Sequence, residues 1–375
     1  MTLIGWALAT AWASDCPPGT TSAGALPPEG SEVWCETPDG VRQGPTQRWK
    51  DGEVVLIGSY AGGLKSGLWT TSYPDGTQES EGTYLNDRRH GAWKHWHENG
   101  QLWFEGEYSL AKATGEWRYY FPAGGLESSG GFIGGAKYGP WTGYHSTGVR
   151  ASSGEFVAGA MDGPWRYWRP DGSLEREGMY RGGRRFGVWK FWRDIGQLER
   201  EANYRDGRLS GVERLFDSAG VLQSETAWEG GERQGLERLF WPGGGVRTAG
   251  SYVNDRRDGE FHAYYEVGAL ERLESWRVGV KHGTWKSWWP DGTLKFQGQL
   301  EFGEETGTWT HWFPDGKDKG TGAFIAGKAD GKWTLWHASG AKRSEGLYRE
   351  GRRVGAWTWW TPEGAVDREE DYGEP

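Results

Sequence analysis

Histidines are the first residues of this sequence to examine for chemistry. The chain has eight, and His95 and His97 lie two residues apart, a spacing that puts both side chains on one face of a β-strand. A metal site needs at least one further ligand that converges on such a pair. However, His311 occupies the same place in an internal repeat as His95, and His145 occupies that of His97. We therefore interpret these histidines as variants at repeat positions and expect neither a metal nor a cofactor.

Acidic residues also recur two apart, and examples are Glu175 with Glu177 and Glu199 with Glu201. A glycosidase-type carboxylate pair would occur once, whereas these pairs repeat along the chain. Their expected role is to pair with basic residues of the neighbouring strand, such as Arg166. No phosphate-binding loop, nucleophile elbow or zinc-protease motif occurs. We expect a protein that is not an enzyme.

A 24-residue repeat positions all of these side chains. Its opening glycine recurs every 24 residues from Gly67 to Gly355, and a further copy opens at Gly44, which gives fourteen repeats. When this glycine is counted as position 0, position +2 is Trp in ten repeats and position +9 is Gly in the thirteen later ones. The clearest copy runs from Gly283 to Gly292. Such regular spacing indicates an array in which each repeat stacks on its neighbours.

Each repeat has room for two strands and two turns, but not for a helix. The first strand contains the Trp-rich segment and ends in a Pro-Asp-Gly type of sequence, which favours a three-residue hairpin loop with a left-handed glycine. The second strand ends in Tyr or Phe. The predicted fold is all-β, an elongated, twisted, single-layer antiparallel β-meander of about fourteen 24-residue hairpin repeats, or about 28 strands.

Aromatic side chains must supply the core, because the chain has 27 Trp and 64 Gly but few aliphatic residues. Positions +2 and +5 have opposite parity in a strand, so either both faces carry an aromatic row or a β-bulge lies between the two positions. The repeat-defining aromatics are Trp93, Trp165, Trp285 and Trp309 at +2, and Trp96, Trp168, Trp288 and Trp312 at +5.

The pattern fails in the middle of the array. In three successive repeats the +2 residue is Glu213, Glu237 or Phe261, and nearby +15 glycines are replaced by Ala202, Thr226 and Glu274. Neutral drift among internal repeats and a local binding surface both account for such a change. We treat Glu213, Glu237 and Phe261 as a candidate interaction patch.

The N-terminus has the features of an exported protein. A short apolar run ends in Ala11-Trp12-Ala13, a pattern typical of signal-peptide cleavage, although no basic residue precedes it and an ordinary apolar N-terminus is the alternative. We predict a signal peptide at 1–14, a cap at 15–43 pinned by a Cys16–Cys35 disulfide, and the repeat array at 44–375. No apolar stretch is long enough to span a membrane. The expected location is periplasmic, outer-surface or secreted, or cytoplasmic if the signal peptide is absent.

The repeats resemble MORN repeats. Tyr60-Ala61-Gly62 leads to Gly67-Leu68-Trp69, with Trp where that family usually has the second glycine of its Gly-x-Gly. This change is similar to bacterial MORN-variant arrays, including YwqK-type antitoxin components. The resemblance implies consecutive β-hairpins without catalytic residues. It also implies an antitoxin or immunity role, which fits poorly with export.

Charge and resemblance together narrow the function. A net charge of -9 argues against nucleic acid as a partner. The predicted function is an exported non-catalytic scaffold that binds an unidentified protein or envelope component. A cell-wall or carbohydrate-binding module is the alternative, since the segment from Gly115 to Phe121 is similar to the aromatic hairpins of choline-binding-type wall modules.

Overall fold

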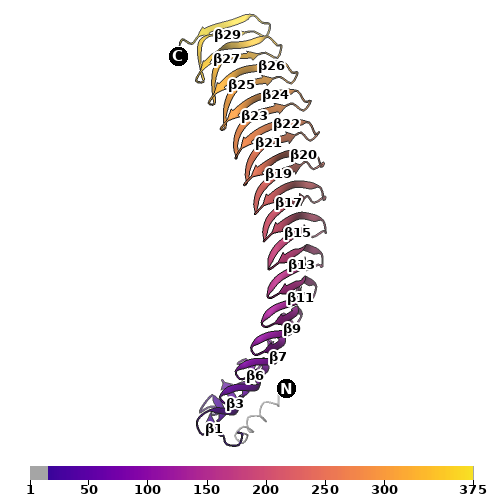
Figure 1. The fold of residues 1–375 in the computed structure, drawn as a ribbon, viewed down its shortest axis with the longest axis vertical. Coiled ribbons are helices and arrows are strands. Elements are labelled where there is room, and N and C mark those ends of the chain that lie inside the picture. The colour runs from indigo at the N-terminus through magenta and orange to yellow at the C-terminus, as the bar shows by residue number, and fades with distance from the viewer. Residues whose placement is uncertain (1–15, 375) are drawn as a thin grey trace. The chain divides into compact units, whose positions relative to one another are not determined.

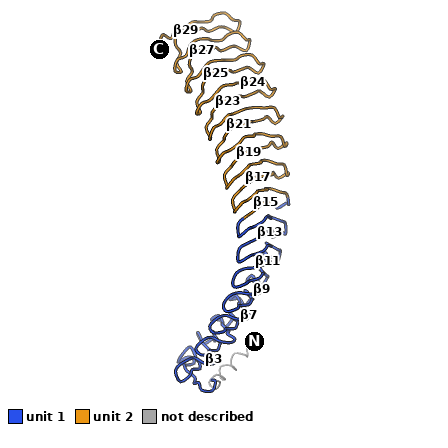
Figure 2. Tube along the Cα trace, in the orientation of Figure 1, with its two compact units in different colours: residues 1–184, 194–196 blue, residues 185–193, 197–375 orange. Residues whose placement is uncertain are grey.

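The computed structural model describes residues 16–374, so the predicted signal peptide lies outside the described residues. The chain divides into two units, residues 1–184 with 194–196 and residues 185–193 with 197–375 (Figure 2). In both units the described residues form β-strands joined by turns (Figure 1). None of the residues 16–374 belongs to a helix long and apolar enough to cross a membrane.

The first unit contains the strands β1 (Thr21–Ala25), β2 (Glu32–Glu36), β3 (Arg42–Lys50), β4 (Glu53–Ala61), β5 (Leu64–Ser72), β6 (Gln78–Leu85), β7 (Arg88–Trp96), β8 (Leu102–Ser109), β9 (Lys112–Tyr120), β10 (Leu126–Ile133), β11 (Ala136–Tyr144), β12 (Arg150–Val157), β13 (Ala160–Trp168) and β14 (Leu174–Arg181). The second unit contains β15 (Arg184–Trp192), β16 (Leu198–Arg205), β17 (Arg208–Phe216), β18 (Leu222–Glu229), β19 (Glu232–Phe240), β20 (Val246–Val253), β21 (Arg256–Tyr264), β22 (Leu270–Arg277), β23 (Val280–Trp288), β24 (Leu294–Glu301), β25 (Glu304–Trp312), β26 (Asp318–Ile325), β27 (Lys328–Trp336), β28 (Lys342–Arg349), β29 (Arg352–Trp360) and β30 (Val366–Asp371).

Within each unit, every strand pairs antiparallel with the strand before it and the strand after it, as β12, β13 and β14 do. The predicted all-β meander of hairpin repeats is therefore confirmed, and the described strands β3 to β30 match the expected number. β1 was not expected, because its sequence, Thr-Ser-Ala-Gly-Ala, has few good strand formers. It pairs with β2, and β2 pairs with β3, so the cap continues the sheet of the first repeats.

From the repeat that opens at Gly67 onward, the first turn is the predicted three-residue hairpin loop, whereas the Gly44 repeat has a two-residue turn at Asp51-Gly52. In the loop at Pro290-Asp291-Gly292, the Trp289 amide donates to the Thr293 carbonyl (2.8 Å), and the Gly292 amide donates to the Trp289 carbonyl (2.9 Å). Gly292 has φ 86°, the left-handed conformation that glycine adopts without strain. The Asp291 carboxylate accepts from the Thr293 amide (2.9 Å), which closes the loop.

The second turn joins one hairpin to the next. In Asn86-Asp87 both residues are left-handed, with φ of 50° and 63°, as a two-residue type I′ turn requires. The Asp87 amide also donates to the Lys65 carbonyl of the preceding repeat (3.0 Å). The same contact, 22 residues apart, recurs at successive turns and fixes the rise from repeat to repeat.

The +2 tryptophans form the core. Trp93, Trp117 and Trp165 are each at most 4% exposed. Each of these three rings lies on the +15 glycine of the preceding repeat, so a Cβ built on Gly106 would meet the Trp117 ring at 2.3 Å. Each indole also donates to a main-chain carbonyl of that repeat, as Trp117 does to Glu107 (3.2 Å). Because glycine has no side chain, the +15 position leaves the space in which each of these rings is buried.

In the first unit, rings at +2 alternate with Tyr or Phe at +17 in a continuous ladder from Tyr60 to Tyr180. Trp93 packs edge-to-face between Tyr84 and Tyr108, with centroids 5.2 and 6.0 Å away. In several repeats a cation at position -2 covers the ladder, and the Arg89 guanidinium lies 4.7 Å from the Trp93 ring centroid. We call the side of the sheet that carries these rings the ladder face.

Both faces carry aromatic rows. Directly paired residues share a face, and Trp165 pairs with Gly178 whereas Arg166 pairs with Glu177. Trp168 lies two residues beyond Arg166 and so shares its side of the sheet, opposite Trp165. We call this side, which carries positions +3, +5 and +14, the charged face. The first of the two sequence alternatives therefore applies, and the bulges occur elsewhere, near the opening glycine and beside position +12.

We predict that Gly106→Ala destabilises the protein by about 1–3 kcal/mol, the usual cost of overpacking, because the added methyl overlaps the Trp117 ring. Hydrogen exchange of the β8 and β9 amides, together with urea unfolding, measures the effect. Gly125→Ala is the matched control, since nothing lies within 4 Å of the added Cβ. Equal behaviour of the two variants would contradict the role assigned to the glycine.

Candidate functional site

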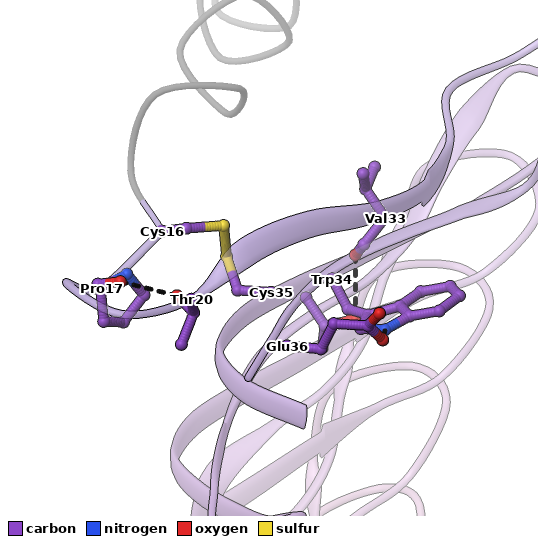
Figure 3. The surroundings of a disulfide bond; sticks show 8 residues. Cys16, Pro17, Thr20, Val33, Trp34, Cys35 and Glu36 are labelled. Carbon is purple, nitrogen blue, oxygen red and sulfur yellow. Dashed lines mark hydrogen bonds between the residues drawn. A yellow bond between two sulfur atoms is a disulfide. The ribbon is translucent and has the colours of Figure 1, made fainter. Parts of the chain in front are cut away.

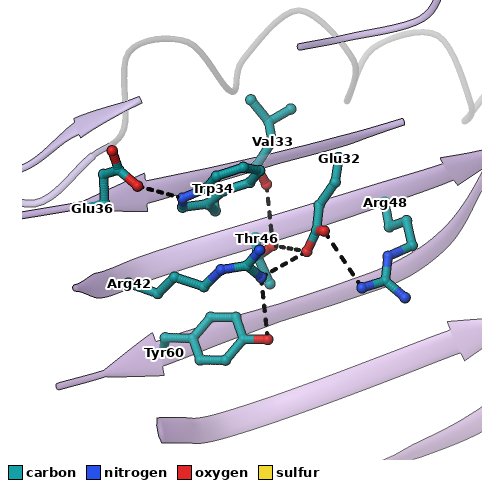
Figure 4. Close-up of polar contacts among 8 residues, drawn as sticks. All are labelled: Glu32, Val33, Trp34, Glu36, Arg42, Thr46, Arg48 and Tyr60. Atoms are coloured by element: carbon teal, nitrogen blue, oxygen red, sulfur yellow. Dashed lines mark hydrogen bonds and ion pairs between the residues drawn. The ribbon is translucent and has the colours of Figure 1, made fainter. Parts of the chain in front are cut away.

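The predicted disulfide is present and holds the cap. Cys16 is bonded to Cys35, which is 3% exposed on β2 (Figure 3). Beside it, Glu32 pairs with Arg42 (2.8 Å) and Arg48 (3.5 Å), as Figure 4 shows. Burial raises the pKa of Glu32, but hydrogen bonds and charge from Arg42, with the charge of Arg48, outweigh it, and the pKa falls below its ordinary value. These polar groups bind one another and the cap is a structural element.

The histidines at position +6 connect successive repeats. His145 and His337 each lie 2.8 Å, through Nε2, from a main-chain carbonyl of the next repeat, at Trp168 and Trp360. His97 makes the same contact with Tyr120 (3.2 Å). Elsewhere the position is filled by other donors, among them Tyr73, Arg193, Trp241 and Tyr265. The histidines at position +6, which the sequence analysis interpreted as variants at a repeat position, thus have an inter-repeat role.

The histidines at position +4 lie on the ladder face. The His311 ring packs near Trp309 and Phe296, and burial, with a smaller contribution from the Lys319 charge, lowers its pKa. His95 packs against Trp103 and Phe104. Over residues 16–374, no group of three or more His, Cys, Asp or Glu side chains is placed to hold a metal ion.

The candidate interaction patch lies in the ladder row. Glu213 replaces a ladder tryptophan and pairs with Ala202 of the preceding repeat. Its side chain is 12% exposed and forms an ion pair of 2.6 Å with Arg200. Phe261 is 7% exposed and continues the ladder against Tyr252. Glu237 pairs with Arg233 at 3.7 Å. The patch remains a prediction, and in the structure these side chains contact their own sheet.

Substitutions at +2 and +15 coincide at two of the three replaced +15 glycines, and Trp285, which lies opposite Glu274, is the exception. Ala202 lies opposite Glu213, and Thr226 lies opposite Glu237, so a Cβ appears where the ring is gone. Where Phe261 keeps a ring, the glycine is kept at Gly250, and a Cβ there would meet the ring at 2.2 Å. The sequence shows both substitutions, but only the strand register reveals that they are partners.

The charged face carries a row of residues that pair directly across successive strands. In the second unit the row runs Glu201, Arg214, Glu225, Arg238, Ala249, His262, Leu273, Lys286, Gln297 and Thr310. Arg214 bridges Glu201 (3.0 Å) and Glu225 (2.8 Å). In the first unit, Arg166 pairs with Glu177 (3.0 Å). The cross-strand pairing of repeated acids with basic residues is therefore present, while Glu175 lies in a bulge.

Two segments of the chain, residues 89–109 and 281–301, match the family model described as the MORN repeat variant. The resemblance seen in the sequence is thus confirmed in two repeats. No curated protein matches the chain.

Among solved structures, the TcdB2-TccC3 complex aligns with 94% of this chain at 12% identity and a TM-score of 0.17. The Tc holotoxin pore of Photorhabdus luminescens aligns at 12% identity and a TM-score of 0.16. This chain spans only 24% and 23% of the chains that it matches there. These scores carry no argument about function.

The pairing of +2 with +15 predicts a specific pair of variants. Glu213→Trp alone should destabilise the protein by about 1–3 kcal/mol, because the new ring meets the Ala202 side chain. Adding Ala202→Gly should restore part of this loss, with a coupling energy of about 0.5–3 kcal/mol in a double-mutant cycle followed by urea unfolding. Ala202→Gly alone is the control. Strictly additive effects would show that the two positions are independent.

Glu345 gives the charged face a testable pH dependence. Its hydrogen bond with Lys342 is the main cause that lowers its pKa from 4.5 to about 2, while burial opposes the shift and Lys332 and Thr334 reinforce it. A lowered carboxyl pKa stabilises the fold above pH 4.5, and this contribution is lost as the pH falls towards 2. Glu345→Gln should therefore flatten the loss of stability over that range. Glu363→Gln, at an exposed turn residue, is the control, and an identical flattening would contradict the assignment.

Proposed function

We propose that the protein is an exported, non-catalytic repeat scaffold that binds a protein or envelope partner through its rows of surface side chains. The observation that carries the proposal is the use of reactive side chains as connectors between repeats. His145, for example, reaches the next repeat through its Nε2, and Arg214 holds two acidic strands together. Such an array offers a partner long, regular surfaces of charge and aromatic rings.

Export is supported by the cap. The Cys16–Cys35 disulfide closes the N-terminal end of the described chain, and structural disulfides persist mainly in oxidising compartments. The apolar N-terminal run with its Ala11-Trp12-Ala13 ending points in the same direction. Together they favour a location outside the cytoplasm over the antitoxin role that the family resemblance implies.

A carbohydrate-binding function is the second candidate, and Trp103 favours it. This ring is 41% exposed and stacks on His97 with centroids 5.5 Å apart, so one aromatic face is held in place beside solvent. Sugar rings bind such fixed aromatic surfaces through their apolar faces. Retention of the protein on isolated cell wall, competed by soluble sugar and lost in Trp103→Ala, is the result expected for this function.

Affinity capture tests the proposed scaffold. One portion of the envelope fraction is acid-quenched and alkylated to count free thiols. From another portion the native protein is captured, and its partners are identified by mass. We expect an oxidised Cys16–Cys35 pair and a stoichiometric partner that rebinds the purified protein. Reduced cysteines together with a cytoplasmic location would overturn the proposal. Toxicity on deletion of the gene, relieved by loss of a neighbouring toxin, would support the antitoxin role instead.

A further inference from the structure

On the charged face of the second unit, a run of basic residues lacks the acidic neighbours found earlier in the row. Up to Glu225, acids and bases alternate from strand to strand. Beyond it the basic positions continue as Arg238, His262 and Lys286, but the acidic positions become Ala249, Leu273 and Gln297. We call Arg238, His262 and Lys286, with the residues between them, the basic run.

The two permanent cations of the basic run, Arg238 and Lys286, are incompletely neutralised, and His262 between them is charged only when protonated. Arg238 has Glu225 on one side, 3.4 Å away, and Ala249 on the other. Lys286 pairs in register with Leu273 and Gln297, neither of which is charged. His262 has a carboxylate nearby, that of Glu260 at 3.7 Å. On a chain with net charge -9, this makes the basic run a local site of positive potential.

Apolar surface borders the basic run. A shallow depression of about 440 Å³ beside Arg238 is lined by Leu236, Val246, Ala249, Tyr264 and Gly268. Leu236 is 40% exposed and also lines a smaller depression of about 240 Å³ on the side of Arg214 and Glu225. A ligand that follows the row would therefore meet cations and apolar contacts in turn.

The spacing of the basic residues indicates which conformation a bound chain would need. Neighbouring strands lie about 4.8 Å apart, so cations two strands apart recur about every 10 Å across the sheet. A polypeptide in the polyproline II conformation rises about 3.1 Å per residue with three residues per turn, so every third side chain lies on the same face, about 9 Å further along. An acidic side chain at every third position would therefore face Arg238, His262 and Lys286 in succession. The residues between would lie over Ala249, Leu273 and the apolar depression.

We propose that the basic run binds an extended acidic segment of a partner protein, which crosses the strands from β19 to β24. The inference rests on the proposed scaffold function and narrows it to one surface and one partner chemistry. Charge complementarity, the apolar border and the matching repeat distance all favour this occupant.

The experiment measures binding of fluorescent twelve-residue peptides to the full protein by anisotropy. The probe peptide has Glu at every third position, and the comparison peptide has the same composition with its Glu residues adjacent. We expect the probe to bind more tightly, with an affinity that falls as salt rises. Lys286→Gln should lower the affinity for the probe about two- to fivefold, the usual range for one exposed ion pair.

The sharpest variant is Ala249→Glu, which places a carboxylate between Arg238 and His262, as Glu225 lies between Arg214 and Arg238. It should pair with Arg238, keep the fold and weaken binding of the probe at least about tenfold, because the Arg238 charge is neutralised and the new carboxylate repels the acidic peptide. Ser153→Glu is the matched control, because it adds the same charge at the same repeat position of the first unit, beside Arg166. We expect it to leave binding unchanged.

Three results would overturn the inference. In the first, the probe binds wild type and Ala249→Glu equally. In the second, Ser153→Glu lowers the affinity for the probe as much as Ala249→Glu does, which would show that the effect comes from the net charge of the protein and not from this surface. In the third, the probe does not bind while polygalacturonate does, in a manner that Lys286→Gln weakens; the basic run would then be a polysaccharide site. The scaffold proposal is judged separately, because a captured native partner that still binds Ala249→Glu supports the scaffold while excluding this surface.

Discussion

The contact between a +2 tryptophan and the +15 glycine of the preceding repeat, present along most of the array, is the constraint on which the structure depends. A single-layer sheet has no second layer to bury its faces, so each repeat must cover part of its neighbour. The Trp117 ring does this by lying on the backbone at Gly106, where no side chain occupies the space, and its indole satisfies the Glu107 carbonyl. The separation of 11 residues between glycine and ring follows, because an insertion between them would separate them, and it is kept by Gly58 and Trp69 even in the shorter first repeat.

The same stacking explains why the residues that invite a search for chemistry have structural roles. A repeat in this array contacts only its neighbours, so its polar side chains are the means of holding the next repeat in place. Position +6 supplies His97 in one repeat and Tyr73 in another, and both reach a main-chain carbonyl 23 residues further along the chain. Residue type can change there as long as a polar group of suitable reach remains. The proposed scaffold function therefore rests on rows of side chains across several repeats.

The sequence allowed the fold to be predicted, because the spacing of the glycines and the Pro-Asp-Gly loops are local signals. It did not decide which faces carry Trp165 and Trp168, since the opening Gly163 is left-handed and the strand parity depends on where each bulge lies. The partnership of Ala202 with Glu213 was equally inaccessible. Those residues are 11 apart, and only the pairing of β16 with β17 shows that they face each other. The composition of β1 gave no strand signal, because that strand is held by pairing with β2.

The strand register also shows that the repeats in the middle of the array, where the sequence pattern fails, differ from the other repeats on both faces of the sheet. On the ladder face, Glu213 and Glu274 introduce carboxylates among the rings, and each is paired with an arginine within 2.8 Å. On the charged face, the acidic positions between β20 and β24 hold Ala249, Leu273 and Gln297. A buried carboxylate needs a partner, and the ladder face provides one, whereas a cation on the charged face stays available to solvent when its acid is removed. Because stacking is local, such a segment can alter both of its surfaces while the repeats on either side keep the tryptophan–glycine contact, which lets one part of a uniform array acquire a distinct surface.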